Sequence, residues 1–467
     1  MAKATRLVRP RTVTADGEGL ASHAGLVWLG EVADRTGLTA GLSAAMAERP
    51  RRRHDPGVTL AQMALALADG ATCVSDLAVL RDQPGLFGPV ASHATAWRTI
   101  AGLAPGEYRR LAGARAQARA AAWAGGAGPA GDEVVIGLDA TLVTTKADKQ
   151  DAAATYKRSY GHHPLLAMCA ETSEVLSIML RPGNAGSNTA ADHVTVLGAA
   201  VAQLPEAWSA GHQAGDDPVE ALRSVLVRAD AAGASHWFAE ECRDRNIGYS
   251  LGSYIDHRVR DALLLVQEED WEPAVEPGGR RRPGAEVTDL TGLVNLDAWP
   301  DGTRLVVRRE RPHPGAQLSL FDTIEGFRHT AFITDTTGSD IAALELRHRQ
   351  RARAEQVIRD AKACGLANLP FSSRADNDAW CQLVACANDL LAWAQRSTLD
   401  GPLRRATPKT IRYRLLHIAA RTTRAGRRLR LDATWPWADK LHAAIERART
   451  RLRPLTVPLR PAIHPGL

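Results

Sequence analysis

Five charged or titratable side chains recur at steps of three and four residues: His348, Arg351, Glu355, Arg359 and Lys362. At 3.6 residues per turn these steps place all five on one face of a helix, and the surrounding pattern predicts that this helix is uninterrupted. A carboxylate can ligate a hard divalent cation, and the flanking cations can hold phosphate groups. The stripe also fits a solvated basic helix in which Glu355 simply pairs with Arg351 or Arg359.

Two apolar runs each end in an aspartate, and these aspartates are the candidate partners of Glu355. Val134–Leu138 is followed by Asp139, and Val225–Ala229 is followed by Asp230. The first run is continuously apolar and the second is apolar apart from Arg228, and such runs are typical of buried strands. Three carboxylates brought together would repel one another and raise one another's pKa, and divalent cations relieve that repulsion. Oxygen ligands suit Mg²⁺ or Mn²⁺, and two such ions can stabilise both oxygens of an in-line phosphoryl displacement.

The order of the surrounding elements predicts how these carboxylates meet. Further strands are expected at 165–170, 175–180 and 247–253, and helices at 190–204 and 235–245. The order is strand, strand, strand, helix, strand, helix, strand and then the Glu355 helix, which is the order of the ribonuclease H fold. In that fold the ends of the first and fourth strands lie side by side. We therefore expect an α/β protein with a ribonuclease H-like mixed five-stranded sheet, and a β-rich insertion before the last catalytic helix.

Composition shifts along the chain divide it into regions, with helical N- and C-terminal regions flanking the catalytic part. An Ala- and Gly-rich stretch without apolar periodicity predicts a linker, and frequent Pro and Gly mark the β-rich insertion. The expected regions are a helical DNA-binding region at 1–115, a linker at 116–132, a catalytic domain at 133–255 and 338–369, the insertion at 256–337, and a basic helical region at 370–467.

The N-terminal region contains a possible helix-turn-helix. A helix is expected to end at Gly70, another lies near 74–80, and a third begins at the N-cap residue Ser92. On this third helix Arg98 is expected to point outward and Trp97 into a core. This layout places a helix in a DNA groove, although many small helical domains share it without binding DNA.

The charge distribution also points to a polyanionic partner. The net charge is +6, from 58 Lys and Arg against 52 Asp and Glu. Residues 341–467 hold 24 basic and 10 acidic residues, or +14, which leaves 34 against 42, or −8, for the rest. Nucleic acid fits this asymmetry better than a membrane, and an Arg-rich composition without a binding role is the alternative. The six cysteines form no CxxC pair, and no apolar run spans a membrane, so we expect a cytoplasmic protein with reduced thiols.

The stripe resembles the Tyr-x2-Arg-x3-Glu-x6-Lys signature of bacterial insertion-sequence DDE transposases, with His348 in place of Tyr. Asp139, Asp230 and the β-rich insertion also match that family. The resemblance implies that the enzyme binds the terminal inverted repeats of its own element, nicks double-stranded DNA with metal-activated water, and joins the 3′-hydroxyl to target DNA. It also implies catalysis by Asp139, Asp230 and Glu355 with two Mg²⁺ or Mn²⁺ ions. A homodimer associated with the bacterial nucleoid is expected.

Several assignments stay open. Trp299 or Trp271 can stack on DNA or belong to the core. Asp192 with His193, and Asp256 with His257, are weaker ligand candidates. Lys157, Arg158, His162 and His163 lie in a loop that either contacts DNA or is merely solvated. Two other functions are a metal-dependent nuclease of the same fold, which leaves no joined DNA, and a catalytically silent DNA-binding protein derived from a transposase.

Overall fold

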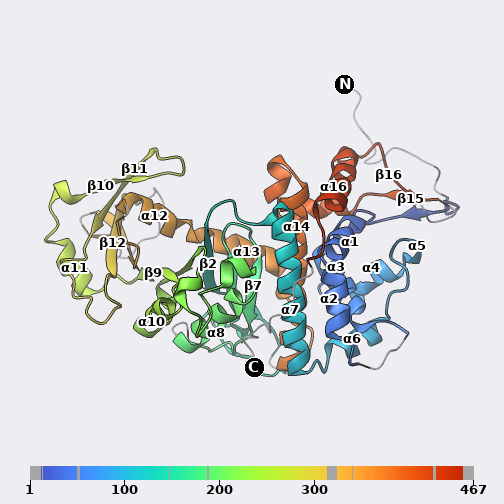
Figure 1. Cartoon of the computed structure of the whole chain (residues 1–467), viewed down its shortest axis with the longest axis horizontal. Coiled ribbons are helices and arrows are strands. Elements are labelled where there is room, and N and C mark those ends of the chain that lie inside the picture. The colour runs from blue at the N-terminus through green and yellow to red at the C-terminus, as the bar shows by residue number, and fades with distance from the viewer. Residues whose placement is uncertain are drawn as a thin grey trace.

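The computed structural model describes residues 12, 14–49, 53–146, 148–186, 189–312, 323–324, 326–338, 340–423 and 428–455. Figure 1 shows an elongated molecule with a helical body at one end, a sheet in the middle and a β-rich extension at the other end. Both ends of the chain contribute to the helical body, where α1 (Leu26–Arg35) packs against α16 (Ala438–Arg451).

The five strands at the centre of the sheet have the ribonuclease H order β7-β6-β2-β8-β9. The pairs β2-β8 and β8-β9 are parallel, whereas β2-β6 and β6-β7 are antiparallel. Every residue of β6 and β7 is buried, so helices cover both faces of this part of the sheet, which explains the continuous apolar runs. The predicted fold is confirmed. The bounds are β2 Glu133–Ala140, β6 Leu165–Cys169, β7 Val175–Met179, β8 Ser224–Ala229 and β9 Gly248–Ser253.

The β-rich insertion continues the catalytic sheet. β14 pairs antiparallel with β9, with Ala331 opposite Ser253, and the sheet then extends through β12, β11 and β10. The insertion at 256–337 is therefore not a separate unit but part of this sheet, and it covers β9, which would otherwise present an open edge of unpaired backbone groups. The elements are α11 His257–Leu263, η5 Glu268–Asp270, β10 Glu272–Val275, β11 Arg281–Asp289, β12 Arg304–Glu310, β13 Thr323–Ile324 and β14 Phe327–Thr334.

Helices on the sheet connect its two parts. α8 contacts β2, β6 and β7, and α10 contacts β9 and α8. α12 packs on the insertion strands, where Leu344 joins a small core with Val306 and Phe332, whereas α13 packs on β2 and β6. The bounds are α8 Ala190–Val201, α9 Glu206–Ser209, η3 Pro218–Glu220, η4 Ala231–Gly233, α10 His236–Asp244, α12 Ile341–Arg349, η6 Gln350–Ala352, α13 Arg353–Ala361 and η7 Lys362–Leu366.

Helix α14 (Arg374–Thr398) is the axis of the helical body. It is buried along almost its whole length and contacts α1, α3, α7, α16 and strand β7. The N- and C-terminal regions, far apart in sequence, therefore share one hydrophobic core. The remaining elements are α2 Leu38–Ala45, α3 Pro56–Asp69, η1 Val74–Leu77, α4 Ala78–Arg81, α5 Pro84–Phe87, α6 His93–Ile100, α7 Pro105–Ala122, η2 Trp123–Ala127, η8 Gly401–Arg405, α15 Pro408–Ile411 and η9 Arg412–Leu416. Two small sheets contain β1 Leu20–Ala21, β15 Ala420–Thr422 and β16 Leu429–Leu431, and β3 Val143–Thr144, β4 Ala153–Ala154 and β5 Tyr160–His162.

The expected linker at 116–132 is wrong over its first part, because α7 continues to Ala122. Alanine has the highest helix propensity, and its small side chain allows close packing on every side of a helix, so apolar periodicity is not needed. Arg119 on α7 is fully buried and pairs with Glu174 at 2.7 Å and with Asp389 of α14 at 2.5 Å. This stretch therefore joins the helical body to the sheet.

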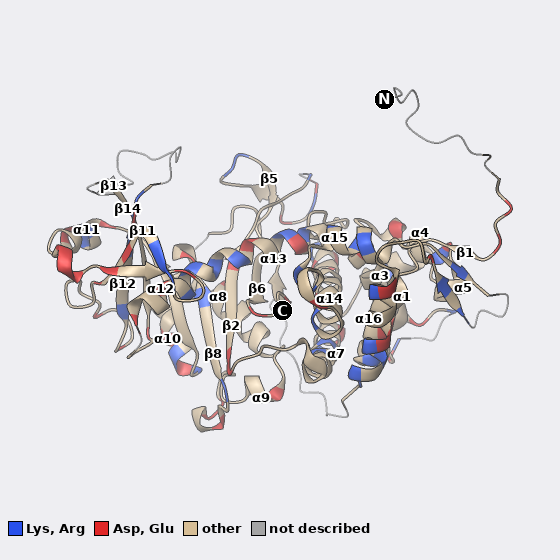
Figure 2. Cartoon of the chain, turned by 90° about the horizontal axis from the view of Figure 1, so that it is seen from above, with Lys and Arg blue, Asp and Glu red and all other residues tan. Residues whose placement is uncertain are grey.

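Charges are unevenly spread over the molecule. Figure 2 shows acidic residues gathered beside α11, where Glu268, Glu269 and Asp270 follow that helix, and basic and acidic residues mixed along α16. Among the described residues, no single helix is both long and apolar enough to cross a membrane, and only the bent pair Pro56–Asp69 and Val74–Arg81 passes that test.

Candidate active site

The two aspartates at the strand ends lie at the same edge of the sheet. In the parallel register of β2 and β8, Leu138 is opposite Ala229, and Asp139 and Asp230 follow these residues directly. The side chain of Asp139 is 16% exposed. The apolar residues that precede Asp139 thus keep its carboxylate largely out of water. The carboxylate of Asp230, which carries the same charge when ionised, lies beside it.

The position of Asp230 is fixed by a tight backbone turn. Its carboxylate accepts hydrogen bonds from the backbone N–H groups of Ala232 (3.0 Å) and Gly233 (3.2 Å) at the start of η4. Gly252 of β9 lies against this turn, and a Cβ there would come within 2.5 Å of the Ala231 nitrogen. A glycine is therefore required for β9 to approach the turn so closely.

Glu355 lies on α13 next to the face that packs on the sheet. Ala354, Val357 and Ile358 are buried, whereas Glu355 is exposed. Burial, the charge of Asp230 and, to a smaller extent, the charge of Glu355 together raise the pKa of Asp139 to about 6. Both carboxylates are therefore close enough for their charges to act on Asp139, as the fold order predicts.

Cations surround this group of carboxylates. The Arg351 guanidinium nitrogen Nη1 lies 3.9 Å from Asp139 Oδ2, and its charge lowers the pKa of Asp139. Lys362 Nζ donates to the carbonyl of Leu142, just beyond β2, at 3.0 Å. Burial and the charge of Lys157 lower the pKa of Lys362. Arg359 is exposed and donates to Gln356 at 3.0 Å.

The stripe is not carried by one uninterrupted helix, and that prediction is wrong at Gln350–Ala352. A 3₁₀ turn there separates α12 from α13. The two helices have different packing partners, the insertion strands for α12 and strands β2 and β6 for α13. No residue of the turn is buried. The backbone can therefore tighten into a 3₁₀ turn at a small cost in free energy, which allows α12 and α13 each to pack on its own strands. The helical segment after α13 ends near Gly365, which has a φ of 107°.

His348 lies inside the protein rather than on its surface. Its side chain stacks on Phe332 with ring centroids 4.4 Å apart and an interplanar angle of 5°. Its Nδ1 is 2.9 Å from Ser250 Oγ. Burial lowers its pKa to about 3, with the charges of Arg228, Arg351 and Arg308 acting in the same direction. His348 is therefore a neutral ring wedged between α12 and the sheet, with only 7% of it exposed.

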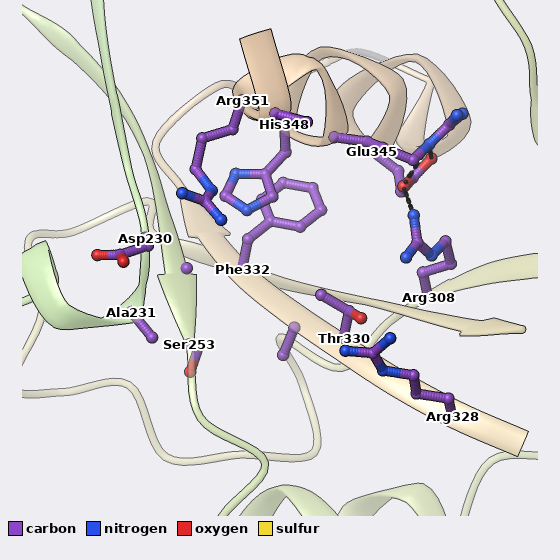
Figure 3. A pocket seen from close by; sticks show the side chains of 14 residues that line it. Asp230, Ala231, Ser253, Arg308, Arg328, Thr330, Phe332, Glu345, His348 and Arg351 are labelled. Atoms are coloured by element: carbon purple, nitrogen blue, oxygen red, sulfur yellow. Dashed lines mark hydrogen bonds and ion pairs between the residues drawn. The ribbon is translucent and has the colours of Figure 1, made fainter. Parts of the chain in front are cut away.

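A cavity of about 290 Å³ opens beside Asp230. Figure 3 shows His348 and Phe332 between Arg351 on one side and Arg308 on the other, with Asp230 and Ser253 across from them. Arg308 donates to Glu345 at 2.8 Å. The other lining residues are Ala231, Gly252, Arg328, Thr330, Ala331, Arg349 and Ala352. The cavity is thus a mainly basic recess next to the carboxylates.

Sequence reasoning did not identify Arg308 and Arg328 of the insertion as parts of this recess. Neither stands out in the sequence, because β12 (RLVVRRE) and β14 (FRHTAFIT) contain further polar and charged residues. The register of β12 and β14, which places Arg308 opposite Thr330, brings them to the site, and that register depends on the whole insertion.

The other candidate residues lie away from the carboxylates or support the fold. Arg98 is exposed on α6, and Trp97 is 41% exposed, with its ring packed on Phe371, so it is less buried than expected. Trp299 is partly buried and meets His236 edge-on at 4.4 Å.

The rival ligand pairs have structural contacts. Asp192 pairs with Arg181 at 3.1 Å, and His193 is buried with Nδ1 3.0 Å from the Thr189 carbonyl. Asp256 caps α11. In the segment before β6, Lys157 and Arg158 are exposed, whereas His162, the last residue of β5, and His163 are buried. The Trp271 ring lies 4.2 Å from the Arg309 guanidinium.

The chain is similar to known transposases. Residues 5–453 match the family model described as transposase DDE domain group 1. A piggyBac transposase, solved in a synaptic complex with hairpin DNA, is similar over 93% of this chain and 85% of its own, with 9% identity and a TM-score of 0.45. No curated protein matches the sequence. Because the family model spans nearly the whole chain, this protein belongs to the transposase DDE domain family, group 1.

Proposed function

We propose that this transposase binds the terminal inverted repeats of its own mobile element, cleaves the DNA ends by metal-dependent hydrolysis, and joins the exposed 3′-hydroxyl to target DNA. The observation that supports it most is the register that brings Asp139 and Asp230 together, with Glu355 near enough to add to the raised pKa of Asp139. Catalytic carboxylates in such a cluster are arranged for a cation, because without one they repel each other.

The donor set fits a hard divalent cation. Transposase DDE domains generally use divalent metal ions, and the residues Asp139, Asp230 and Glu355 offer only carboxylate oxygens, which suit Mg²⁺ or Mn²⁺. We assign these three residues to the binding of two such ions. Ions bound there would supply a more acidic water and neutralise charge at the scissile phosphate.

The chain's own cations complete the proposed site. Arg351 and Lys362 flank the carboxylates and are assigned to the phosphates nearest the cut, and Arg359 to phosphates further along the strand. His348 has too little exposed surface for a main DNA contact, so we assign it to positioning Arg351, three residues away, instead. Arg98 on α6 and Trp299 remain candidates for DNA contacts outside the catalytic site.

The proposed partners are double-stranded DNA and a second copy of the chain. Two transposon ends must be brought together, so we propose a homodimer in the synaptic complex. The basic excess of residues 341–467 supports a DNA partner, since clustered Lys and Arg release counterions from the phosphate backbone. We place this activity on the chromosome in the bacterial cytoplasm.

The test incubates purified protein and Mg²⁺ with labelled DNA that carries the repeats flanking its gene. Wild type is compared with Glu355→Gln, which removes one carboxylate charge, and with Glu240→Gln, a matched control at an exposed position of α10. Cleavage at the repeat boundary and joined products are expected with wild type and Glu240→Gln, and neither with Glu355→Gln.

The other outcomes separate the alternatives. Cutting that ignores the repeats and yields no joined product would favour a nuclease of the same fold. Repeat-specific binding without cleavage in all three proteins would favour a silent DNA-binding protein.

A further inference from the structure

Three side chains from distant parts of the chain converge in the helical body, well outside the carboxylate site. His23 Nδ1 lies 2.6 Å from Asp69 Oδ2, and His417 Nε2 lies 3.0 Å from Asp69 Oδ1. The two imidazole rings are 4.2 Å apart between centroids. One ligand atom from each residue lies within 4.8 Å of the others. Each carboxylate oxygen thus faces a different ring nitrogen.

The backbone holds the two histidines beside each other. Ala24 N–H donates to the Ile418 carbonyl and Gly25 N–H to the Leu416 carbonyl, both at 3.1 Å. A Cβ at Gly25 would fall 2.0 Å from the Leu415 carbonyl oxygen, so only glycine permits this approach. His23 itself has a φ of 52°, a conformation that non-glycine residues seldom adopt. The main chain, and not the flexibility of the side chains, therefore fixes the positions of His23 and His417 relative to each other.

Asp69 is fixed from the third side. It ends α3, and Gly70 follows with a φ of 113°. Arg412 Nε donates to the adjacent carbonyl of Ala68 at 2.8 Å, and its Nη2 donates to the Ala363 carbonyl in the turn after α13 at 3.0 Å. Asp69 is only 5% exposed, whereas the side chains of His23 and His417 are 29% and 40% exposed. The three groups therefore form a buried carboxylate below two imidazoles that open to solvent.

The charges in this cluster favour a cation. With both rings neutral, its net charge is −1. Burial raises the pKa of Asp69, but the hydrogen bonds from His23 and His417 outweigh it and lower the pKa overall. The hydrogen bond to Asp69 raises the pKa of His23. The carboxylate is thus ionised and is satisfied by two ring N–H groups, whose protons a metal ion can replace.

We infer that His23, Asp69 and His417 form a site for a first-row divalent transition metal ion of the Zn²⁺ class. Two imidazoles and one carboxylate suit Zn²⁺, Co²⁺ and Ni²⁺ better than Mg²⁺, and three protein ligands leave a position for water. The ion ties the segment before α1 and the segment after η9 to the end of α3. Arg412 links the end of α3 to the turn after α13. The site therefore stabilises the helical body where it meets α13, the helix that carries Glu355. This inference does not depend on the proposed function.

Cobalt provides a spectroscopic test on the full chain. Protein freed of metal with a chelator is titrated with Co²⁺, whose visible absorption reports nitrogen and oxygen ligands, and Zn²⁺ is then added as a competitor. One Co²⁺ per chain is expected to bind at this site, to raise the thermal unfolding midpoint and to be displaced by Zn²⁺. His23→Gln and His417→Gln are each expected to weaken Co²⁺ binding more than about tenfold. Even the loss of a residue that only supports a metal ligand reduces metal affinity by about that much. Glutamine can still hydrogen-bond to Asp69.

Two controls separate this site from other ligands. Glu355→Gln alters the carboxylate site and His442→Gln removes an exposed histidine of α16, and neither is expected to change the absorption or the affinity of the Co²⁺ bound by His23 and His417. X-ray absorption of the wild-type protein with bound Co²⁺ gives the number of imidazole ligands without any substitution. Two imidazole ligands are expected. Fewer than two imidazoles, unchanged affinity in both histidine variants, or no saturable absorption in wild type would each overturn the inference.

Discussion

Arg351 and Asp139 face each other at the edge of the sheet, with guanidinium Nη1 3.9 Å from carboxylate Oδ2. Arg351 comes from the 3₁₀ turn between α12 and α13, and Asp139 from β2. The arginine charge opposes the burial and the neighbouring carboxylates that raise the pKa of Asp139 to about 6. One residue of the stripe thus influences the protonation of a proposed metal ligand while its side chain remains 29% exposed.

Replacement of Arg351 by alanine is expected to slow DNA cleavage roughly 100-fold, a typical effect of removing one charge-stabilising donor. It is also expected to move the acid limb of the pH–rate profile to higher pH, because the pKa of Asp139 rises when Arg351 no longer lowers it. Single-turnover cleavage between pH 5.5 and 8.5 measures both effects. Arg353→Ala removes the same charge from an exposed neighbour and should leave the acid limb in place. An unshifted limb in Arg351→Ala would contradict the coupling to Asp139.

Asp139→Asn is expected to stabilise the protein without metal at pH 7. The folded-state pKa of Asp139 lies above its usual 3.8, at about 6, so the folded state binds more protons than the unfolded state between these values. The free energy of unfolding therefore falls as pH rises from about 4 to about 6, and Asn removes that fall. A gain of about 1–3 kcal/mol at pH 7 follows. Urea unfolding in chelator at pH 4.5 and 7 measures it, with the exposed Asp244→Asn as control.

His348 is expected to make the free energy of unfolding depend on pH in the direction opposite to that of Asp139. Its pKa in the folded protein is lowered to about 3, whereas the unfolded histidine binds a proton near 6.5. Stability should therefore fall as the pH drops below 6.5, by several kcal/mol in total. His348→Phe keeps the stacking on Phe332 and loses the hydrogen bond to Ser250. At pH 7 it should cost about 1 kcal/mol, but it should unfold less steeply in acid than wild type. Equal acid sensitivity of the two proteins would exclude His348 as the source.

Lys362 is expected to contribute to DNA affinity because its positive charge attracts the DNA phosphate groups. Lys362→Ala is expected to weaken binding to all sequences similarly and to reduce the slope of log K against log salt by about one. Fluorescence anisotropy at several salt concentrations, with repeat and random DNA, measures both. Arg223→Ala is the charge-matched control, because Arg223 precedes β8 whereas Asp230 follows it at the opposite edge of the sheet. A loss confined to repeat DNA would instead indicate base recognition.

The buried ion cluster between α7 and α14 should be sensitive to the loss of one carboxylate. Asp389 accepts hydrogen bonds from Arg115 (2.6 Å) and Arg119 (2.5 Å), and all three side chains are at most 2% exposed. Asp389→Ala leaves two buried arginines short of a counter-charge, and about 3–5 kcal/mol of stability should be lost. Asp400→Ala breaks an exposed pair with Arg447 and should cost less than about 1 kcal/mol. Equal losses, measured by urea unfolding, would contradict this reasoning.

The central fold was predictable because its strands are buried on both faces. Val134–Leu138 is a continuous apolar run and Val225–Ala229 is apolar apart from Arg228, so both read as buried strands, and each is followed by its aspartate. That Asp139, Asp230 and Glu355 lie close to one another could be predicted because each was marked by a local pattern, a strand-like apolar run or a helical periodicity. The site residues from the insertion were not found, because Arg308 and Arg328 reach the cavity only through antiparallel pairing over a long sequence separation.

The errors came from residues whose conformation depends on tertiary contacts. The 3₁₀ turn at Gln350–Ala352 consists of residues that favour helices in isolation, and it forms because α12 and α13 pack on different strands. The Ala-rich stretch before Trp123 looked like a linker, yet a helix of small residues fits into a crowded interface. The cluster of His23, Asp69 and His417 was missed for the same reason, since nearly the whole chain separates its first and last residues.

The antiparallel register of β12 also restricts which length changes this chain can accommodate. Neighbouring residues on a strand face opposite sides, so Arg308 lines the cavity while Arg309 pairs with Glu286 and Glu268 on the other side. A deletion of one codon between Leu305 and Arg308 would exchange these two faces and leave an arginine without its carboxylates. Length changes within this strand are therefore tolerated only in pairs, whereas the connections beyond it can lengthen one residue at a time.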